Sequence, residues 1–184
     1  MNTTTILEIK KLLFTSKKVV IVPHKNPDGD AMGSTLGLCL YLKKIGHSAT
    51  VIAPNDYPEF LKWIPGNKDV IIHEMDTINS EDLISSADVI FTLDFNALHR
   101  CGEMRTPIAN AKGVKIMIDH HQQPDSYADY VYSDVTMSST CQMVYHFIEK
   151  MEDLNQIDTS IGEALYTGIM TDTASFRFPL TTST

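Results

Sequence analysis

The chain has 184 residues, of which 43% are hydrophobic and 21% are charged, so it is long enough for one globular domain with a sizeable core. Its net charge of −8 at pH 7 argues against an open nucleic-acid groove, because such a groove normally presents a basic surface to phosphates. A small anionic substrate held by metal ions is compatible with this composition.

No apolar run approaches the roughly 18 residues that a membrane helix needs, and the N-terminus shows no apolar segment followed by a small-residue cleavage site. We therefore expect a cytoplasmic protein with no membrane partner. The cysteines Cys39, Cys101 and Cys141 are widely spaced and form no C-x-x-C pair, which predicts neither a disulfide framework nor a zinc site of thiolates. We expect all three to be small packing residues.

Helical and strand-like segments alternate along the chain. Residues 5–14 place apolar side chains on one helical face, and the short β-branched run of residues 17–24 follows as a buried strand. Residues 31–46 have helical apolar spacing and end in a basic last turn and a glycine, which predicts a second helix. Further strands are predicted at residues 49–54, 68–72, 87–93 and 113–118, further helices at residues 138–151 and 160–170, and an extended segment leading into the polar end "FRFPLTTST".

The strand-like runs are continuously apolar instead of alternating with polar residues. Strands of this kind are covered on both faces, as in a parallel sheet flanked by helices. The pattern predicts an open, doubly wound, mainly parallel α/β sheet with helices on both faces. No internal repeat, low-complexity tract or Gly/Ser linker divides the chain, so we expect residues 1–184 to form one domain.

Acidic side chains and imidazoles follow the apolar runs. Open α/β sheets bind ligands at the carboxyl edge of their strands, so residues that follow different strands share one crevice. After the last apolar run, residues 113–118, come Asp119, His120 and His121. The six strongest candidates for metal ligands are His24, Asp28, Asp30, Asp94, His120 and Asp172.

Four carboxylates among these candidates would balance the charge of two divalent cations. Oxygen-rich sites with some imidazole and no thiolate favour Mn²⁺, whereas Mg²⁺ usually keeps more water; Mg²⁺ and Co²⁺ are the alternative ions. Two ions about 3.5–4 Å apart can share a carboxylate and clamp both the attacking and the leaving oxygen of an in-line phosphoryl displacement. The acids therefore predict a two-metal site.

The stretch "HKNPDGDAMGS" from His24 to Ser34 has the composition of a tight turn that leads into a helix. Pro27 and Gly29 prevent one continuous helix and allow a turn that presents His24, Asp28 and Asp30 together. The helix is expected to begin near Asp30, where its positive end favours anions. Small residues that follow leave room for the close approach of backbone or of a phosphate, namely Gly33, Ser34 and Gly37.

Each candidate also has a structural interpretation. Asp28 and Asp30 are typical turn and N-cap residues, Asp94 alone could start a turn, and Asp172 could cap the segment that follows it. One histidine of the pair after the strand could be a core residue that donates to Asp119. The joint placement after successive core elements favours a metal site. The remaining histidines considered, His47, His73 and His146, are expected to be surface or packing residues without acidic partners at ligand spacing.

Four stretches, "HKNPDGDAMGS", "LDFNALHR", "IDHH" and "YTGIMTDTASFRF", resemble in order the four motifs of the DHH phosphoesterases. The form N-P-D-G-D-A with G-S is similar to the branch of bifunctional oligoribonucleases and PAP phosphatases, also called nanoRNases. The resemblance spans nearly the whole chain. It implies a five-stranded parallel sheet and two Mn²⁺ ions.

The resemblance also implies roles for individual residues. One ion would be held by His24, Asp28 and Asp94, and the other by Asp30, Asp94, His120 and Asp172, so that Asp94 would bridge the two. Asp119 would orient His120, and His121 would contact the scissile phosphate or protonate the leaving oxygen. The implied phosphate contacts are Asn26 and Arg100.

The function implied is a metal-dependent phosphoesterase acting on short oligonucleotides or phosphoadenosine phosphate. Alternatives are a cyclic-dinucleotide phosphodiesterase, a RecJ-like single-strand exonuclease and, from another class, a nucleotide-binding module without catalysis. Members of the branch carry a second, C-terminal DHHA1 domain that grips the nucleotide, and residues 1–184 show no sign of it. We expect the chain to be the catalytic DHH half, with the DHHA1 domain as a missing partner and a homodimer as a candidate assembly.

Overall fold

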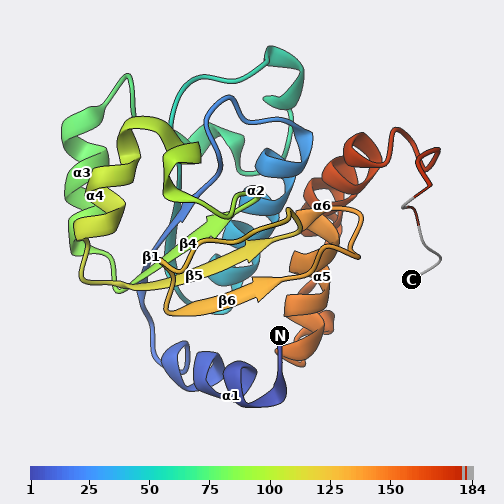
Figure 1. Cartoon of the computed structure of the whole chain (residues 1–184), viewed down its shortest axis with the longest axis horizontal. Helices are drawn as coiled ribbons and strands as arrows, with labels where there is room; N and C mark the ends of the chain where they lie inside the picture. Colours follow the sequence, from blue (N-terminus) through green and yellow to red (C-terminus); the bar gives the residue numbers. More distant parts are fainter. Residues whose placement is uncertain (180, 182–184) are drawn as a thin grey trace.

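The structure is a computed structural model that describes residues 1–179 and residue 181. Helices and strands alternate through most of this part of the chain (Figure 1). Four short 3-10 segments lie at Glu59–Leu61, Asn67–Asp69, Leu98–Met104 and Leu154–Gln156. The longer elements are α1 (Thr3–Leu12), β1 (Lys18–Val22), α2 (Gly29–Lys44), β2 (Ser48–Ala53), β3 (Ile71–Ile72), α3 (Thr77–Ser86), β4 (Val89–Leu93), α4 (Arg105–Asn110), β5 (Val114–Asp119), β6 (Tyr130–Ser133), α5 (Thr140–Lys150) and α6 (Thr159–Asp172).

The strands form one parallel sheet in the order β3-β2-β1-β4-β5-β6. The chain moves outward from β1 to β3 and then returns to place β4 on the other side of β1, so the topological switch lies between β1 and β4. Open α/β sheets bind their ligands at this point, outside the carboxyl ends of the strands. The doubly wound α/β fold predicted above is confirmed.

The predicted number of five strands is wrong, because the sheet has a sixth strand, β6, at one edge. Only Tyr132 of its four residues is buried, so β6 forms no continuous apolar run. The adjacent strand β5 fixes its position through the pairs Met117–Val131 and Ile118–Tyr132. An edge strand covered on one side carries a weaker hydrophobic signal than a central one.

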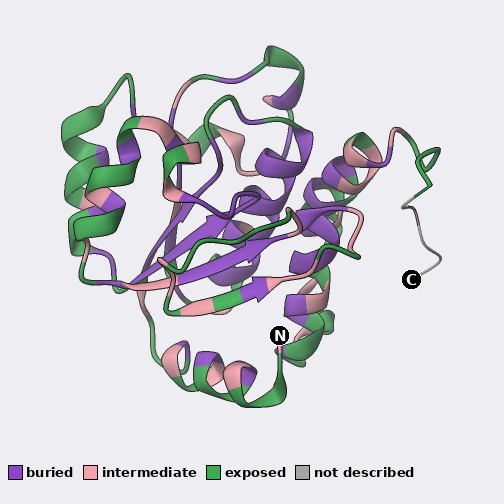
Figure 2. Cartoon of the chain, viewed as in Figure 1, coloured by how far each residue is buried: buried purple, intermediate pink, exposed green. Residues whose placement is uncertain are grey.

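Each face of the sheet has its own hydrophobic core. Successive residues of β1 alternate between them: Val19 and Ile21 lie in the core under α1, α2, α5 and α6, whereas Val20 and Val22 lie in the core under α3 and α4. The central strands β1 and β4 are buried almost throughout, and the outer faces of the helices are exposed (Figure 2). This two-sided burial explains why the strand segments read as continuous apolar runs.

Two helices on the second face, α3 and α4, were not predicted from the sequence. Helix α3 buries only Ser80 and Ile84, so its apolar face is too narrow to produce a clear helical pattern. After α6 the predicted extended segment is wrong, because the chain forms consecutive turns with left-handed backbone at Ala174, Ser175 and Phe176. Within the polar C-terminal stretch, residue 180 and residues 182–184 lie outside the described residues.

The three cysteines are buried and free, in agreement with their prediction as packing residues. In the described part of the chain, no helix combines the length and the apolar character that a membrane span requires.

Helices α2 and α6 pack closely, and this contact prepares the site. A Cβ at Gly33 would lie 2.5 Å from the carbonyl oxygen of Ala164, and a Cβ at Gly168 would collide with the sulfur of Cys141 and lie 2.8 Å from Oδ1 of Asp30. Gly33 was expected to leave room for either backbone or a phosphate, and the structure shows the close approach of the α6 backbone. The contact brings the start of α2 next to the end of α6.

Candidate metal centre

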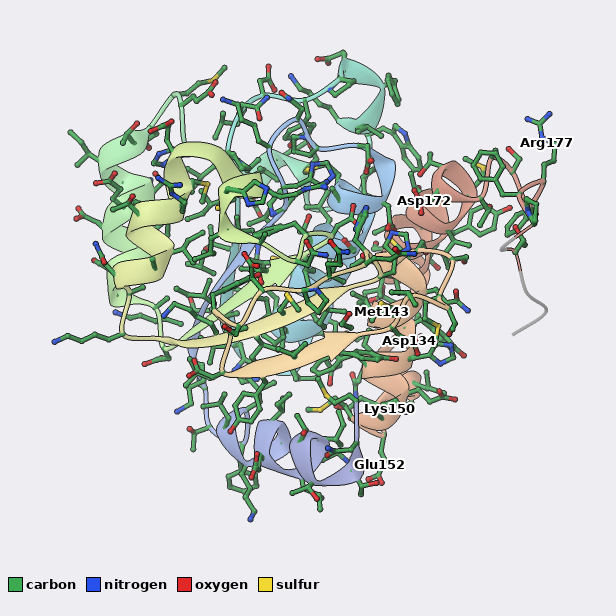
Figure 3. All side chains as sticks on the ribbon, viewed as in Figure 1. Asp134, Met143, Lys150, Glu152, Asp172 and Arg177 are labelled. Atoms are coloured by element: carbon green, nitrogen blue, oxygen red, sulfur yellow. The ribbon has the colours of Figure 1, made fainter. Side chains whose placement is uncertain are left out.

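The six predicted ligands lie together at the carboxyl edge of the sheet, beside the switch between β1 and β4. His24, Asp94 and His120 follow β1, β4 and β5, respectively, and Asp30 lies in the first turn of α2. Asp172 is the last residue of α6, and its side chain is labelled in Figure 3. Five elements from four separate parts of the sequence thus supply one site, although the role of these residues as ligands stays a prediction.

His24, Asp28 and Asp94 form the first ligand group. Nε2 of His24 lies 3.8 Å from Oδ2 of Asp28 and 3.4 Å from Oδ2 of Asp94. Nδ1 of the same ring lies 2.8 Å from the carbonyl oxygen of Lys25. Because a carbonyl can only accept, Nδ1 carries a proton, and Nε2 is the nitrogen available to a cation.

Asp30, His120 and Asp172 form the second group. Nε2 of His120 lies 3.9 Å from Oδ2 of Asp30 and 3.6 Å from Oδ2 of Asp172. Its Nδ1 lies 3.3 Å from the carbonyl oxygen of Met137, which again leaves Nε2 facing the carboxylates. The ligand atoms within each group are all within 4.8 Å of one another.

Asp94 belongs to the first group and also faces His120 of the second, and it forms a further group with His120 and His121 whose ligand atoms lie within 4.8 Å of one another. Its Oδ2 lies beside His24, and its Oδ1 lies 3.6 Å from Nε2 of His120. The carboxylate is almost fully buried, and the residue has a left-handed backbone with φ of 64°, a conformation that non-glycine residues seldom adopt outside turns and functional sites. The sharp turn after β4 therefore directs one carboxylate between two clusters.

Asp28 combines a structural role with its place in the first group. Its Oδ1 accepts hydrogen bonds of 3.0 Å from the backbone N–H groups of Asp30 and Ala31, so it is the N-cap of α2. The other oxygen, Oδ2, faces His24. The N-cap and ligand interpretations of Asp28 are thus compatible, because each uses a different oxygen.

The start of α5 was missed as part of the site. The backbone N–H groups of Thr140 and Cys141 donate to Oδ2 and Oδ1 of Asp30, at 2.6 and 2.9 Å. The Thr140 hydroxyl donates to Oδ1 of Asp94 at 2.9 Å. The consecutive hydroxyl residues at the start of this helix were the available signal, but only a three-dimensional arrangement shows which carboxylates they face.

Asp119 contacts a different histidine from the one expected. Its Oδ1 lies 2.7 Å from Nδ1 of His121, and its Oδ2 accepts from the backbone N–H of His121 at 2.9 Å. The expected orientation of His120 by Asp119 is therefore wrong, since the carbonyl of Met137 occupies that place. Neighbouring side chains at the end of a strand point in different directions, and Asp119 reaches the second residue after it.

The two expected phosphate contacts lie at the edge of the site. Asn26 exchanges hydrogen bonds with Asn55: its N–H donates to Oδ1 at 2.7 Å, and its Oδ1 accepts from Nδ2 at 3.0 Å. The positive charge of Arg100 is close enough to His121 to oppose protonation of that ring. Both phosphate contacts stay predictions.

The other histidines lie elsewhere. His47 and His73 are buried and bond to the N–H of Lys17 and the hydroxyl of Ser80, respectively. His146 was expected to have no acidic partner, but its Nδ1 lies 3.0 Å from Glu149 one helical turn away. This surface pair on α5 follows ordinary i,i+3 spacing.

Burial controls the protonation of the acids in the second group. It raises the pKa of Asp30 well above its usual value, with the nearby charge of Asp94 adding to the effect, and it also raises the pKa of Asp172. Burial acts in the same direction on Asp94, but hydrogen bonding and charge from His24 outweigh it, so the pKa of Asp94 is lowered. The acids therefore compete for positive charge.

The histidines supply part of the positive charge that these carboxylates require. Burial lowers the pKa of His24, but its hydrogen bonds to Asp94 and to the Lys25 carbonyl outweigh burial and raise the pKa overall. In the described part of the chain, no lysine or arginine forms an ion pair with any of the four carboxylates. Clustered oxygens with imidazole nitrogens and no thiolate fit hard or intermediate divalent cations.

Comparisons with known proteins agree with this geometry. A model of the DHH family, N-terminal domain, matches residues 18–169. The bifunctional oligoribonuclease and PAP phosphatase NrnA of Bacillus subtilis is 30% identical over 169 residues, which are 89% of this chain and 49% of that protein. The protein of the same name from Thermus thermophilus is 33% identical over 166 residues, 89% of this chain and 46% of that one.

A solved structure is also similar over nearly the whole chain. The crystal structure of an exopolyphosphatase-related protein from Bacteroides fragilis has a TM-score of 0.97 and 40% identity, and the match covers 99% of this chain and 54% of that one. The chain spans about half the length of the curated relatives that it matches. From the family match and from the acids and histidines gathered at the switch point, we conclude that this chain belongs to the DHH family.

Proposed function

We propose that the chain is the catalytic DHH domain of a metal-dependent phosphoesterase that hydrolyses short oligonucleotides and phosphoadenosine phosphate. The observation that carries this proposal is the placement of Asp94, whose two oxygens face two different groups of acids and imidazoles. A carboxylate so placed is the typical bridging ligand of a two-metal hydrolase. The names of the similar curated proteins support the choice of substrates.

Two Mn²⁺ ions are the proposed cofactor, with Mg²⁺ and Co²⁺ as substitutes. His24, Asp28 and Asp94 would hold one ion, and Asp30, Asp94, His120 and Asp172 would hold the other. Ions bound there would activate water and offset the negative charge of a phosphate. The charge of the four carboxylates supports this number of divalent ions, since no lysine or arginine among the described residues pairs with them.

His121 is the proposed proton donor to the leaving oxygen. Its hydrogen bond to Asp119 raises the pKa of the ring above the usual value, with burial opposing the shift. The imidazole is therefore doubly protonated in a larger fraction of the molecules near neutral pH. Nδ1–H stays directed at Asp119, and Nε2–H is the proton that can move to the substrate oxygen. Asp119 therefore acts as a positioning residue.

Arg100 and Asn26 are the proposed contacts to the substrate phosphates. Arg100 adds positive charge on the side of His121, and Asn26 lies on the turn after β1. Because the curated relatives are about twice as long, we also propose that a C-terminal DHHA1 domain supplies further contacts to the nucleotide. Residues 1–184 alone should then bind metal ions but turn over oligonucleotides slowly.

The substrate proposal is tested by side-by-side hydrolysis assays of pApA, phosphoadenosine phosphate, cyclic di-AMP and a longer single strand, each with MnCl₂ and with EDTA. We expect slow, Mn²⁺-dependent hydrolysis of pApA and phosphoadenosine phosphate, which Asp94→Asn reduces to background. Faster cleavage of cyclic di-AMP or of the longer strand would favour the alternative enzymes. Equal rates for the natural chain and for Asp94→Asn would contradict the proposed site.

A further inference from the structure

The first turn of α5 lies against the two most deeply buried carboxylates among the six proposed ligands. Asp30 and Asp94 are 1% and 2% exposed. Buried carboxylates are strongly destabilised unless hydrogen-bond donors or cations surround them. The donors around these two come largely from Thr140, which is itself fully buried.

The shortest contacts between α5 and the carboxylate of Asp30 come from backbone groups, and the Cys141 side chain adds a further hydrogen bond. The N–H groups of Thr140 and Cys141 would otherwise lack partners, because they lie in the first turn of α5, and each donates to one oxygen of Asp30. Substitution of a side chain on α5 leaves these donors in place. The position of Asp30 is therefore largely independent of which residue occupies position 140.

The contact of Asp94 depends on a side chain. The Thr140 hydroxyl donates to Oδ1, the oxygen that faces His120, and Oδ2 faces His24 without a donor from α5. A carboxylate can rotate about its Cβ–Cγ bond with little resistance. The hydroxyl bond opposes this rotation and keeps the two oxygens directed at different ligand groups.

We propose that Thr140 is a positioning residue that makes the centre binuclear, because its hydroxyl fixes the carboxylate of Asp94 across the two ligand groups. This inference rests on the proposed two-metal site. Partners of a metal ligand in the surrounding shell typically change metal affinity by about 10- to 100-fold when they are removed. Without the hydroxyl, Asp94 can turn toward either group, and the ion that loses its oxygen binds more weakly.

Mn²⁺ titrations of three variants test the proposal. Thr140→Val removes the hydroxyl and keeps the shape, Thr140→Ser keeps the hydroxyl, and Thr35→Val removes a buried hydroxyl that bonds only to carbonyls of its own helix. Free Mn²⁺ is counted by its electron paramagnetic resonance, and spin coupling between bound ions reports a binuclear centre. Thermal unfolding in EDTA checks the fold, and Thr140→Ala replaces Thr140→Val if the latter unfolds.

We expect the natural chain, Thr140→Ser and Thr35→Val to bind two spin-coupled Mn²⁺ ions. Thr140→Val should bind one ion with little change and the second about 10- to 100-fold more weakly, with loss of the coupled signal. Two coupled ions of unchanged affinity in both Thr140→Val and Thr140→Ala would overturn the role of Thr140. Fewer than two ions in the natural chain would instead overturn the proposed two-metal site.

Discussion

The candidate metal centre and the groove between α3 and α4 are two hollows with opposite properties. The groove has a volume of about 920 Å³, and its lining includes His73, Glu81, Glu103 and Lys112. The hollow beside His120 at the metal centre measures only about 80 Å³. The larger volume therefore lies away from the convergent acids and histidines.

The metal centre and the groove differ in whether their acidic and histidine side chains point toward one common position. Among the described residues, every group of three or more acidic, histidine or cysteine side chains that could share one ion lies at the metal centre, and none includes a groove residue. In the groove, His73 already bonds to Ser80, and Glu74 pairs with Lys25. Volume measures how much can enter a site, whereas the direction of its polar atoms determines its chemistry.

Replacing one acid at the metal centre and one in the groove gives the largest expected contrast. Asp94→Ala removes an oxygen from both ligand groups, so both Mn²⁺ binding and hydrolysis of pApA should fall to background. Glu81→Ala in the groove should leave both within about twofold of the natural chain, since solvated surface charges contribute little. Titration calorimetry and a hydrolysis assay measure the two effects, and equal losses in both variants would contradict the contrast.

Within the centre, the roles of proton donor and ligand can be separated. His121→Asn removes the proposed proton donor and should lower kcat by about 10²- to 10⁴-fold, the usual range for general acid catalysis. Mn²⁺ affinity should stay the same, because His121 is outside the proposed ligand sets. A parallel loss of Mn²⁺ binding would show that His121 is a ligand instead.

The close contact of α2 and α6 predicts a difference between two glycines of the same helix. Gly168→Ala places a Cβ against Cys141 and Asp30, whereas a Cβ at Gly162 has nothing within 4 Å. Gly168→Ala should destabilise the protein by about 1–3 kcal/mol and weaken Mn²⁺ binding through Asp30. Gly162→Ala should stabilise it by about 0.5–1 kcal/mol.

Urea unfolding in EDTA measures both free energies of unfolding. Equal effects of the two substitutions, or tight Mn²⁺ binding by Gly168→Ala, would show that the contact does not position Asp30.

The smallest expected effect is a change of stability with pH. Burial raises the pKa of Asp30, and contacts with Asp94 raise the pKa of His24. Groups with a raised pKa bind more protons in the folded chain than in the unfolded chain, so the metal-free protein should become less stable as pH rises through the raised values.

Mn²⁺ competes with the same protons. The increase in Tm caused by MnCl₂ should therefore grow as pH rises through this interval, and differential scanning fluorimetry over a pH series measures it. An increase that is constant, or larger at acidic pH, would contradict the placement of the cation beside His24 and Asp30.

Local sequence patterns predicted much of the fold and the membership of the site. Continuous apolar runs marked β1, β4 and β5, and His24, Asp94 and His120 follow these strands within two residues. The pattern works because parallel strands end at a common edge of the sheet, so the residues that follow each apolar run are expected to lie at that edge.

What could not be predicted depends on contacts between distant segments. The order β2-β1-β4 comes from tertiary pairing, and α3 and β6 carry too few buried residues to be recognised locally. The partner of Asp119 depends on side-chain directions in a single loop, which spacing does not specify. Thr140 was overlooked because its carboxylate partners lie 110 and 46 residues away along the chain.

Anomalous scattering from crystals soaked in MnCl₂ tests the central claim most directly. The account predicts two manganese peaks at the carboxyl edge, one next to His24 and Asp28 and one next to His120 and Asp172, with Asp94 between them. A single peak, no peak at this edge, or manganese bound in the groove between α3 and α4 would contradict it.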